Sequence, residues 1–145
     1  MRGLILALGF LTRLPLPVLR DFQPAELARA LVWFPAAGLV VGATVALAAA
    51  LGAALDPWLG ALAGVVMWAW ITSGLHLDGL ADTADALGAA HRDPARFLAV
   101  LADPHVGSFG VIALVLQVMA KLVLLHWLLI LESSWRVLVL IPAWA

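Results

Sequence analysis

Three aspartates, Asp78, Asp82 and Asp85, stand close together in a chain that is 65% hydrophobic. If this segment is helical, each residue turns by about 100°, so positions i, i+4 and i+7 share one stripe about 60° wide. Neighbouring carboxylates on this stripe would lie ~6 Å apart and repel by roughly 3 kcal/mol per pair. They therefore need protonation, an arginine partner or a bound cation. A set of oxygen ligands favours Mg²⁺, Mn²⁺ or Ca²⁺ over zinc.

The alternative interpretation of this aspartate stripe (Asp78, Asp82 and Asp85) is a solvated helix face. Such a face usually mixes Lys, Glu, Gln and Ser, whereas this one combines Asp with small residues. Asp is also a poor helix former. Because ionisable residues in membrane segments are usually functional, we interpret the stripe as a binding site for a divalent cation. Gly79, beside Asp78, would let backbone or ligand approach closely.

A second polar segment runs from Asp103 to Gly110 and contains a glycine-bearing turn. Ser108 is placed to cap the helix that follows. Backbone N–H groups at a helix N-terminus can hold phosphate oxygens. Gly107 and Ser108 are therefore candidates for phosphate contacts.

The composition indicates which kind of element must position these residues. The chain has 145 residues, 12% of them charged, and a mean hydropathy of +1.08. Soluble domains are about 25% charged, so we expect an all-α, polytopic helical bundle in a membrane, forming a single transmembrane domain over 1–145. The absence of cysteine excludes disulfides and thiolate metal sites. A net charge of −1 indicates no nucleic-acid partner.

Apolar runs long enough to cross a bilayer, about 20 residues each, are expected at 31–55, 58–75 and 106–131. Residues 3–12 are too short, and 23–30 form a short interfacial helix with Pro24 in its first turn. Gly38 and Gly42, four apart, either allow another helix to come close or only reflect the high frequency of glycine in membrane helices. A fourth apolar run begins after Ser134 and stops with the sequence, so we expect the N-terminal part of a longer protein.

Basic residues orient these spans, because loops rich in Lys and Arg face the cytoplasm. Three arginines precede the first span and two follow the second, and the turn between these spans has none. These arginines are Arg13, Arg20, Arg29, Arg92 and Arg96. We therefore expect residues 13–30 and 76–105 on the cytoplasmic side of the inner membrane, with the aspartate stripe facing the cytosol.

Four stretches occur in one order that resembles a known family. They are FLTRLP at 10–15, FPAAG at 34–38, HLDGLADTAD at 76–85, and Asp103 followed by GSFGV at 107–111. Together they resemble the adenosylcobinamide-GDP ribazoletransferase (cobalamin synthase) family over nearly the whole chain. The resemblance implies a Mg²⁺-dependent reaction at the cytoplasmic membrane. Adenosylcobinamide-GDP and α-ribazole, or its phosphate, give adenosylcobalamin, or its phosphate, and GMP, which completes nucleotide loop assembly.

For a reaction of this kind, the aspartate stripe and its neighbours lead us to expect roles for single residues. The metal ligands would be Asp78, Asp82, Asp85 and Asp103, and the proton acceptor would be Asp85 or His76. The substrate contacts would be Arg13, Gly79, Arg96, His105, Gly107 and Ser108. The alternative for Arg13 is an interfacial anchor.

This chain departs from the family pattern in three respects. It has Asp85-Ala86 where the family usually has Asp-Gly, and Asp103-Pro104-His105 where the family usually has Asp-Ser-Arg. His105 or Arg96 would then replace the missing arginine at the phosphate. Family members are also longer, which leaves open whether this chain is active alone.

Two other functions fit parts of the sequence. The aspartate spacing is loosely similar to that of CDP-alcohol phosphotransferases, although the chain lacks their arginine after the Asp-Gly pair. A cation or proton transporter could use the aspartates as a relay. Acids in pumps usually sit near mid-membrane, whereas these lie at the cytoplasmic end of a span. A homo-oligomer remains open.

Overall fold

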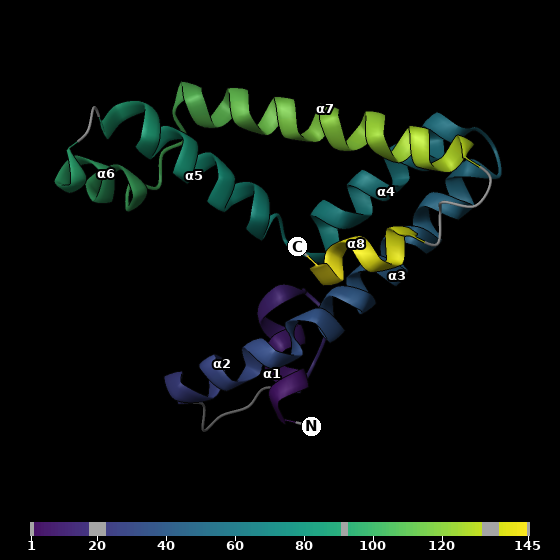
Figure 1. The fold of residues 1–145 in the computed structure, drawn as a ribbon, viewed down its shortest axis with the longest axis horizontal. Helices are drawn as coiled ribbons and strands as arrows, with labels where there is room; N and C mark the ends of the chain where they lie inside the picture. Colours follow the sequence, from purple (N-terminus) through teal and green to yellow (C-terminus); the bar gives the residue numbers. More distant parts are fainter. Residues whose placement is uncertain (1, 18–22, 91–92, 132–136, 145) are drawn as a thin grey trace. The chain divides into compact units, whose positions relative to one another are not determined.

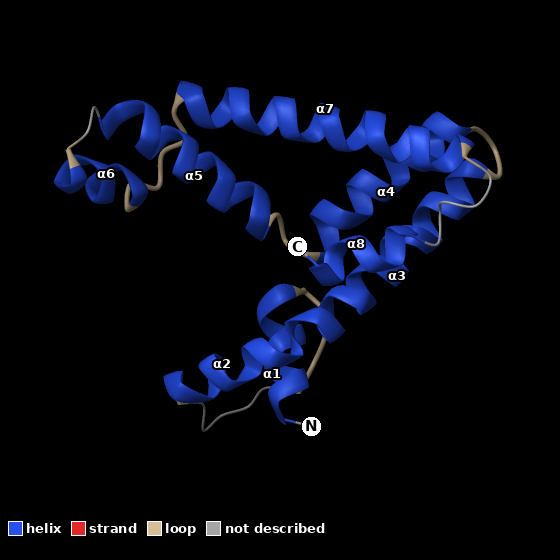
Figure 2. Ribbon diagram, viewed as in Figure 1, coloured by secondary structure: helices blue, strands red, loops and turns tan. Residues whose placement is uncertain are grey.

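The computed structural model describes residues 2–17, 23–90, 93–131 and 137–144. Every regular element in these ranges is helical, which confirms the all-α prediction (Figures 1 and 2). In chain order they are α1 (Arg2–Leu11), α2 (Pro24–Ala30), the 3-10 turn η1 (Leu31–Trp33), α3 (Phe34–Ala53), α4 (Pro57–Ile71), α5 (Leu75–Ala90), α6 (Pro94–Leu101), α7 (Ser108–Ile130) and α8 (Val137–Trp144). Arg20, Arg92 and the start of the fourth apolar run lie outside the described residues.

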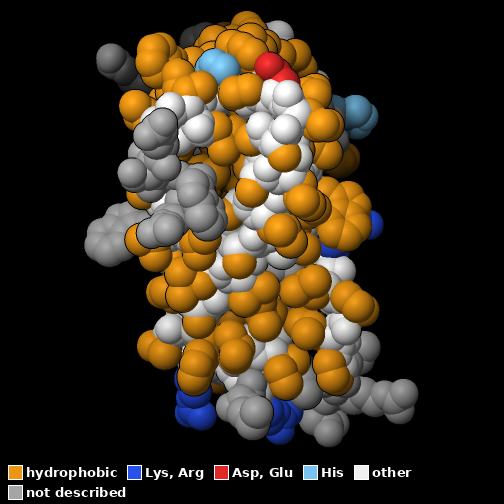
Figure 3. Space-filling model, turned by 90° about the vertical axis from the view of Figure 1, so that its right-hand side faces the viewer, with side chains coloured by type: hydrophobic (Ala, Val, Ile, Leu, Met, Phe, Trp, Pro, Cys, Tyr) orange, Lys and Arg blue, Asp and Glu red, His pale blue; other side chains and the backbone are white. Residues whose placement is uncertain are grey.

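Among the residues that the structure describes, two helical segments, Ala28–Ala53 and Ser108–Ile130, are long and apolar enough to cross a membrane. The pair α4 and α5 adds a third if the two helices form one broken span. Hydrophobic side chains cover most of the face drawn in Figure 3. Apolar helices of this length are typical of membrane proteins, which is the class that the composition predicted.

The second predicted span is shorter in the structure than in the sequence prediction. It was expected over 58–75, but α4 ends at Ile71 and a new helix begins at Leu75. Ser73 and Gly74 separate the two helices with φ values of 52° and 71°. These values lie in the left-handed region, which glycine adopts freely and which interrupts an α-helix. The aspartate stripe therefore lies on a helix of its own.

The described residues divide into two compact units, one drawn from 1–73 and 122–145 and the other from 74–121. In the first unit, α3 packs against α4 and α8. A Cβ added to Gly38 would overlap the carbonyl oxygen of Pro142, and one added to Gly42 would overlap that of Val139. The predicted close approach at these glycines is confirmed, and α8 is the helix that approaches.

The second unit contains α5, α6 and the first part of α7, and it carries the aspartate stripe. Asp93 caps α6 by accepting a hydrogen bond of 3.0 Å from the N–H of Ala95. Helix α6 packs against α5. On α5 the buried apolar positions are small, namely Ala81, Ala86 and Ala90. Small side chains bring neighbouring backbone close to α5, which decides the surroundings of the aspartates.

Candidate functional site

Helix α5 carries all three aspartates of the stripe, at the spacing that places them on one side of a regular helix. Their surroundings differ sharply. Asp78 is exposed, Asp82 is partly exposed, and Asp85 is buried, with 8% of its surface accessible. The stripe therefore has an open part near the start of α5 and a closed part near its middle.

The open pair, Asp78 and Asp82, has free carboxylates. Neither side chain accepts a hydrogen bond or forms an ion pair with another described residue. Between them Gly79 faces open space, since a Cβ added there would meet no atom within 4 Å. Two carboxylates one turn apart repel each other unless a cation is present. Mg²⁺ is commonly held by one or two carboxylates plus substrate phosphates, so the open pair fits such an ion.

Asp85, by contrast, has both carboxylate oxygens occupied. The N–H of Gly107 donates to Oδ2 at 2.7 Å, and the N–H of Gly110 donates to Oδ1 at 2.9 Å. Gly107 immediately precedes α7, and Gly110 lies in its first turn. These N–H groups have no partner within their own helix, and the helix dipole favours negative charge at this end. Asp85 thus caps α7 from a different helix.

This geometry corrects the prediction that Ser108 caps the third span. Ser108 is the first residue of α7, and its hydroxyl makes no hydrogen bond with another described residue. It also limits the predicted phosphate site, because the N–H of Gly107 is engaged by Asp85. Gly110 was missed by the sequence analysis. The second glycine of GSFG was the signal that could have identified it, because a Cβ at that position would overlap the Asp85 carboxylate.

Asp103 and His105 form a compact turn before α7. Oδ1 of Asp103 lies 2.6 Å from Nδ1 of His105 and accepts the backbone N–H of His105 at 3.0 Å. The hydrogen bonds from the His105 ring and backbone lower the pKa of Asp103 below its ordinary value. Both side chains are exposed. Oδ2 of Asp103 accepts no hydrogen bond from the described residues, so it stays free for a ligand.

The predicted four-aspartate metal site stays a prediction. In the described part of the chain, no group of three or more His, Asp or Glu side chains is placed to share one ion. The other predicted site residues of this unit, His76 and Arg96, are exposed and form no ion pair with described residues. His76 lies two residues before Asp78, about 160° away around α5. The structure therefore groups Asp85 with Gly107 and Asp103 with His105.

Arg13 belongs to the first unit, where it is attached to the end of α4. The backbone N–H of Arg13 donates to the backbone carbonyl of Ile71 at 2.9 Å, and the guanidinium carbon lies 5.0 Å from the ring centroid of Trp70. A cation over a tryptophan face is attracted by the ring. The sequence analysis did not pair Arg13 with Trp70. The side chain of Arg13 remains exposed, so both predicted roles stay open.

Comparisons with known proteins bear out the resemblance. An adenosylcobinamide-GDP ribazoletransferase of Thiobacillus denitrificans is 88% identical over 144 residues, which cover 99% of this chain and 58% of that protein. Proteins with the same name from Laribacter hongkongensis and Novosphingobium aromaticivorans are 63% and 59% identical over 145 residues, covering 59% and 58% of their lengths. They cover 100% and 98% of this chain, respectively. The chain thus spans less than two thirds of the relatives it matches.

No solved structure matches the chain. The model of the cobalamin-5-phosphate synthase family matches residues 3–145, nearly the full sequence. With that match and relatives this similar, the chain belongs to the cobalamin-5-phosphate synthase family.

Proposed function

We propose that the protein to which this chain belongs is an adenosylcobinamide-GDP ribazoletransferase. It would join α-ribazole, or its phosphate, to the cobinamide phosphate of adenosylcobinamide-GDP and release GMP. The family match and the shared name of the relatives support this reaction. Within the chain, the observation that carries it is the open pair, because free adjacent carboxylates suit a metal-assisted transfer of an activated phosphate.

Mg²⁺ is the proposed cofactor, held by Asp78 and Asp82. The ion would supply positive charge against the diphosphate and stabilise GMP as the leaving group. Asp103 is a candidate for a further ligand through its free Oδ2. The proposal gives Asp85 no place in this set, because both its oxygens already accept backbone hydrogen bonds.

The remaining predicted residues serve the substrates. Arg96 and His105 are exposed in the same unit as the open pair and offer positive charge or N–H donors for phosphate oxygens. Arg13, held over Trp70, is a further candidate phosphate contact. For proton removal from the ribazole hydroxyl, His76 remains the available candidate of the two predicted, since Asp85 is engaged.

The proposed location is the inner membrane, with the open pair on the cytoplasmic side. The supporting observation is the distribution of arginines along the sequence, which favours that side for residues 13–30 and 76–105. Substrates with charged phosphates would then reach Asp78 and Asp82 from the cytosol.

The test is GMP release by the chain, and by its 88% identical relative, in liposomes supplied with adenosylcobinamide-GDP, α-ribazole and Mg²⁺. Asp82→Asn, or the same change in the relative, should lower the rate by on the order of 100-fold, because a metal contributes several kcal/mol to the transition state. The matched control is Thr83→Ala, an exposed neighbour whose hydroxyl bonds within α5. Its rate should stay close to the unchanged protein.

Three outcomes would contradict the proposal or part of it. Ion flux across the liposomes without nucleotide would favour the transporter, and transfer to a lipid alcohol would favour a CDP-alcohol phosphotransferase. An Asp82→Asn rate equal to that of Thr83→Ala would remove the metal role from the open pair.

A further inference from the structure

We infer that Asp85 is a positioning residue, which caps α7 from α5 and so fixes the segment from Asp103 to Gly110 on the helix that carries the open pair. Its effect on catalysis rests on the proposed function, whereas the cap itself does not. Asp85 is buried and each of its oxygens already accepts a backbone hydrogen bond, so we assign it to the cap rather than to the metal or the base.

The first turn of α7 has no cap of its own. Gly107 precedes the helix and has no side chain that could accept a hydrogen bond, and the Ser108 hydroxyl makes none with the described residues. Backbone N–H groups that leave water must find an acceptor elsewhere. The buried carboxylate of Asp85 accepts two of them, and hydrogen bonds to an ionised acceptor are stronger than neutral ones.

Steric contacts around Asp85 show that the fit depends on glycine. A Cβ on Gly110 would overlap Oδ2 of Asp85 and lie 3.0 Å from the carbonyl oxygen of Ala81. A Cβ on Gly107 would lie 2.9 Å from Cγ of Asp85. A side chain at either position would force its neighbours to shift, so the backbone of the turn packs directly against the Asp85 side chain.

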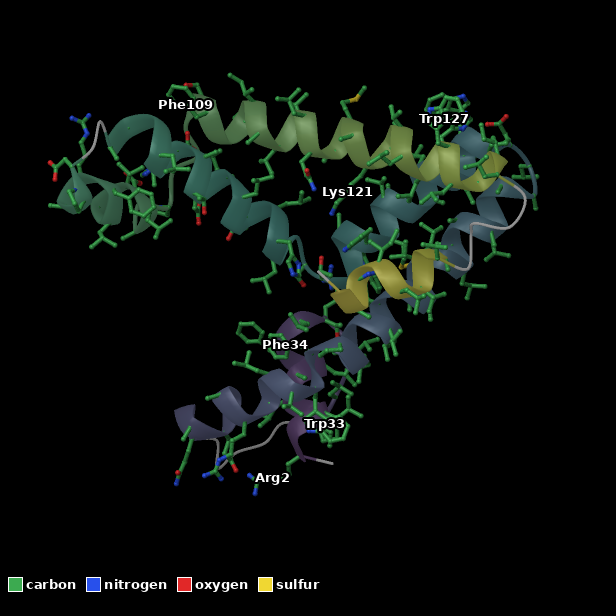
Figure 4. The ribbon with its side chains drawn as sticks, in the orientation of Figure 1. Arg2, Trp33, Phe34, Phe109, Lys121 and Trp127 are labelled. Atoms are coloured by element: carbon green, nitrogen blue, oxygen red, sulfur yellow. The ribbon has the colours of Figure 1, made fainter. Side chains whose placement is uncertain are left out.

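A second contact one turn further along α5 extends this interface. Gly88 faces the ring of Phe109, which comes from the first turn of α7 (Figure 4). A Cβ on Gly88 would lie 2.6 Å from Cε2 and 2.7 Å from Cγ of that ring. Ala81, Asp85 and Gly88 stand at i, i+4 and i+7, so one side of α5 receives the start of α7.

The chemistry of the cap requires a carboxylate rather than an amide. The N–H groups of Gly107 and Gly110 donate to different oxygens of Asp85, whereas asparagine offers one oxygen and an NH₂ group that can only donate. Asp85→Asn keeps the shape and leaves one backbone N–H facing another donor. Because Asp103 and His105 directly precede this turn, its displacement would move them together.

The experiment compares Asp85→Asn with Asp78→Asn in the chain and in the relative, in liposomes or micelles. Amide hydrogen exchange at Gly107 and Gly110 should speed up by about 10-fold in Asp85→Asn, as expected for loss of a cap. It should be unchanged in Asp78→Asn. This readout needs no activity, so it decides the inference even if GMP release is never observed.

The Mg²⁺ dependence of GMP release separates positioning from metal ligation. Asp85→Asn should raise KM for adenosylcobinamide-GDP or lower kcat while the Mg²⁺ concentration at half-maximal rate stays the same. Asp78→Asn should shift that concentration by about 10-fold or more. Unchanged exchange in Asp85→Asn, or a Mg²⁺ shift as large as that of Asp78→Asn, would overturn the inference.

Gly110→Ala keeps the experiment decisive if Asp85→Asn does not fold. This variant keeps the Asp85 carboxylate, but the added methyl would push that carboxylate away from the turn. Hydrogen exchange at Gly107 should therefore speed up in the same way. Gly79→Ala is its matched control, because a Cβ there enters open space. Exchange at Gly107 that is no faster in Gly110→Ala than in the unchanged protein would also overturn the inference.

Discussion

The open pair and Asp85 are the same residue type on the same side of one helix, yet their surroundings give them opposite uses. Asp78 and Asp82 have no fixed partner among the described residues, whereas Asp85 accepts two backbone hydrogen bonds. Sequence spacing decides which side of a helix a carboxylate occupies. The segments that pack against that side decide whether the carboxylate remains available to bind a ligand.

The physical reason for the difference is hydration. An exposed carboxylate is solvated by water, which a cation can replace, so it needs no protein partner until the ligand arrives. A buried carboxylate must find fixed donors, because an unpaired charge away from water is costly. The start of α7 supplies such donors to Asp85. Asp85 therefore stabilises the fold rather than binding a ligand.

Removal of the Asp85 side chain should have the largest effect on stability. Asp85→Ala loses two charge-assisted hydrogen bonds and leaves two N–H groups of α7 unpaired, which costs about 2–4 kcal/mol. Asp78→Ala removes an exposed carboxylate and should change stability by about 0.5 kcal/mol or less. Unfolding of both variants in detergent, followed by circular dichroism, measures the contrast. Equal losses would end the distinction between the two parts of the stripe.

Gly110→Ala should come next, since its added methyl overlaps Asp85. We expect a loss of about 1–3 kcal/mol, the usual range for an overpacked contact. The same unfolding measurement applies. Stability at or above that of the unchanged protein would show that the start of α7 does not press against the carboxylate.

Gly79→Ala tests the open part of the stripe. A helix gains about 1 kcal/mol when alanine replaces an interior glycine, and no atom lies within 4 Å of the new methyl. If substrate binds over the open pair, this stabilised variant should nonetheless release GMP several-fold more slowly, because the added methyl displaces the substrate from its reactive position. A variant that is both more stable and fully active would place the substrate elsewhere.

The smallest expected effect concerns the turn at Asp103. His105→Ala removes the side-chain hydrogen bond that lowers the pKa of Asp103, so that pKa should rise toward its ordinary value. A carboxyl group with a lowered folded pKa stabilises the fold above its unfolded pKa and loses that contribution as pH falls through the folded value. A carbon-13 NMR titration of the Asp103 carboxyl checks the direction. An unchanged pKa would contradict the pairing.

The sequence predicted the features that depend on local pattern. The stripe follows from helical spacing, two of the spans from the length of apolar runs, and the approach of α8 from the spacing of Gly38 and Gly42. The start of α2 at Pro24 is also a local signal.

The burial of Asp85 could not be predicted in the same way. Its partners lie 22 and 25 residues further along the chain, and no local pattern encodes such a contact. The usual preference for serine at a cap pointed to Ser108, but a buried acid from a neighbouring helix took that place. The break at Ser73 and Gly74 likewise depends on backbone conformation, which the apolar run expected over 58–75 did not reveal.

The most direct test of the central claim follows the three carboxyl groups during a titration with Mg²⁺, which is diamagnetic and so does not broaden the signals of groups that it does not bind. In protein labelled with carbon-13 at aspartate carboxyls, the signals of Asp78 and Asp82 should shift as Mg²⁺ is added, while the Asp85 signal stays in place. A shift of Asp85 as large as those of Asp78 and Asp82, or no shift of the open pair, would contradict the division between an open pair that binds the ion and a buried aspartate that caps α7.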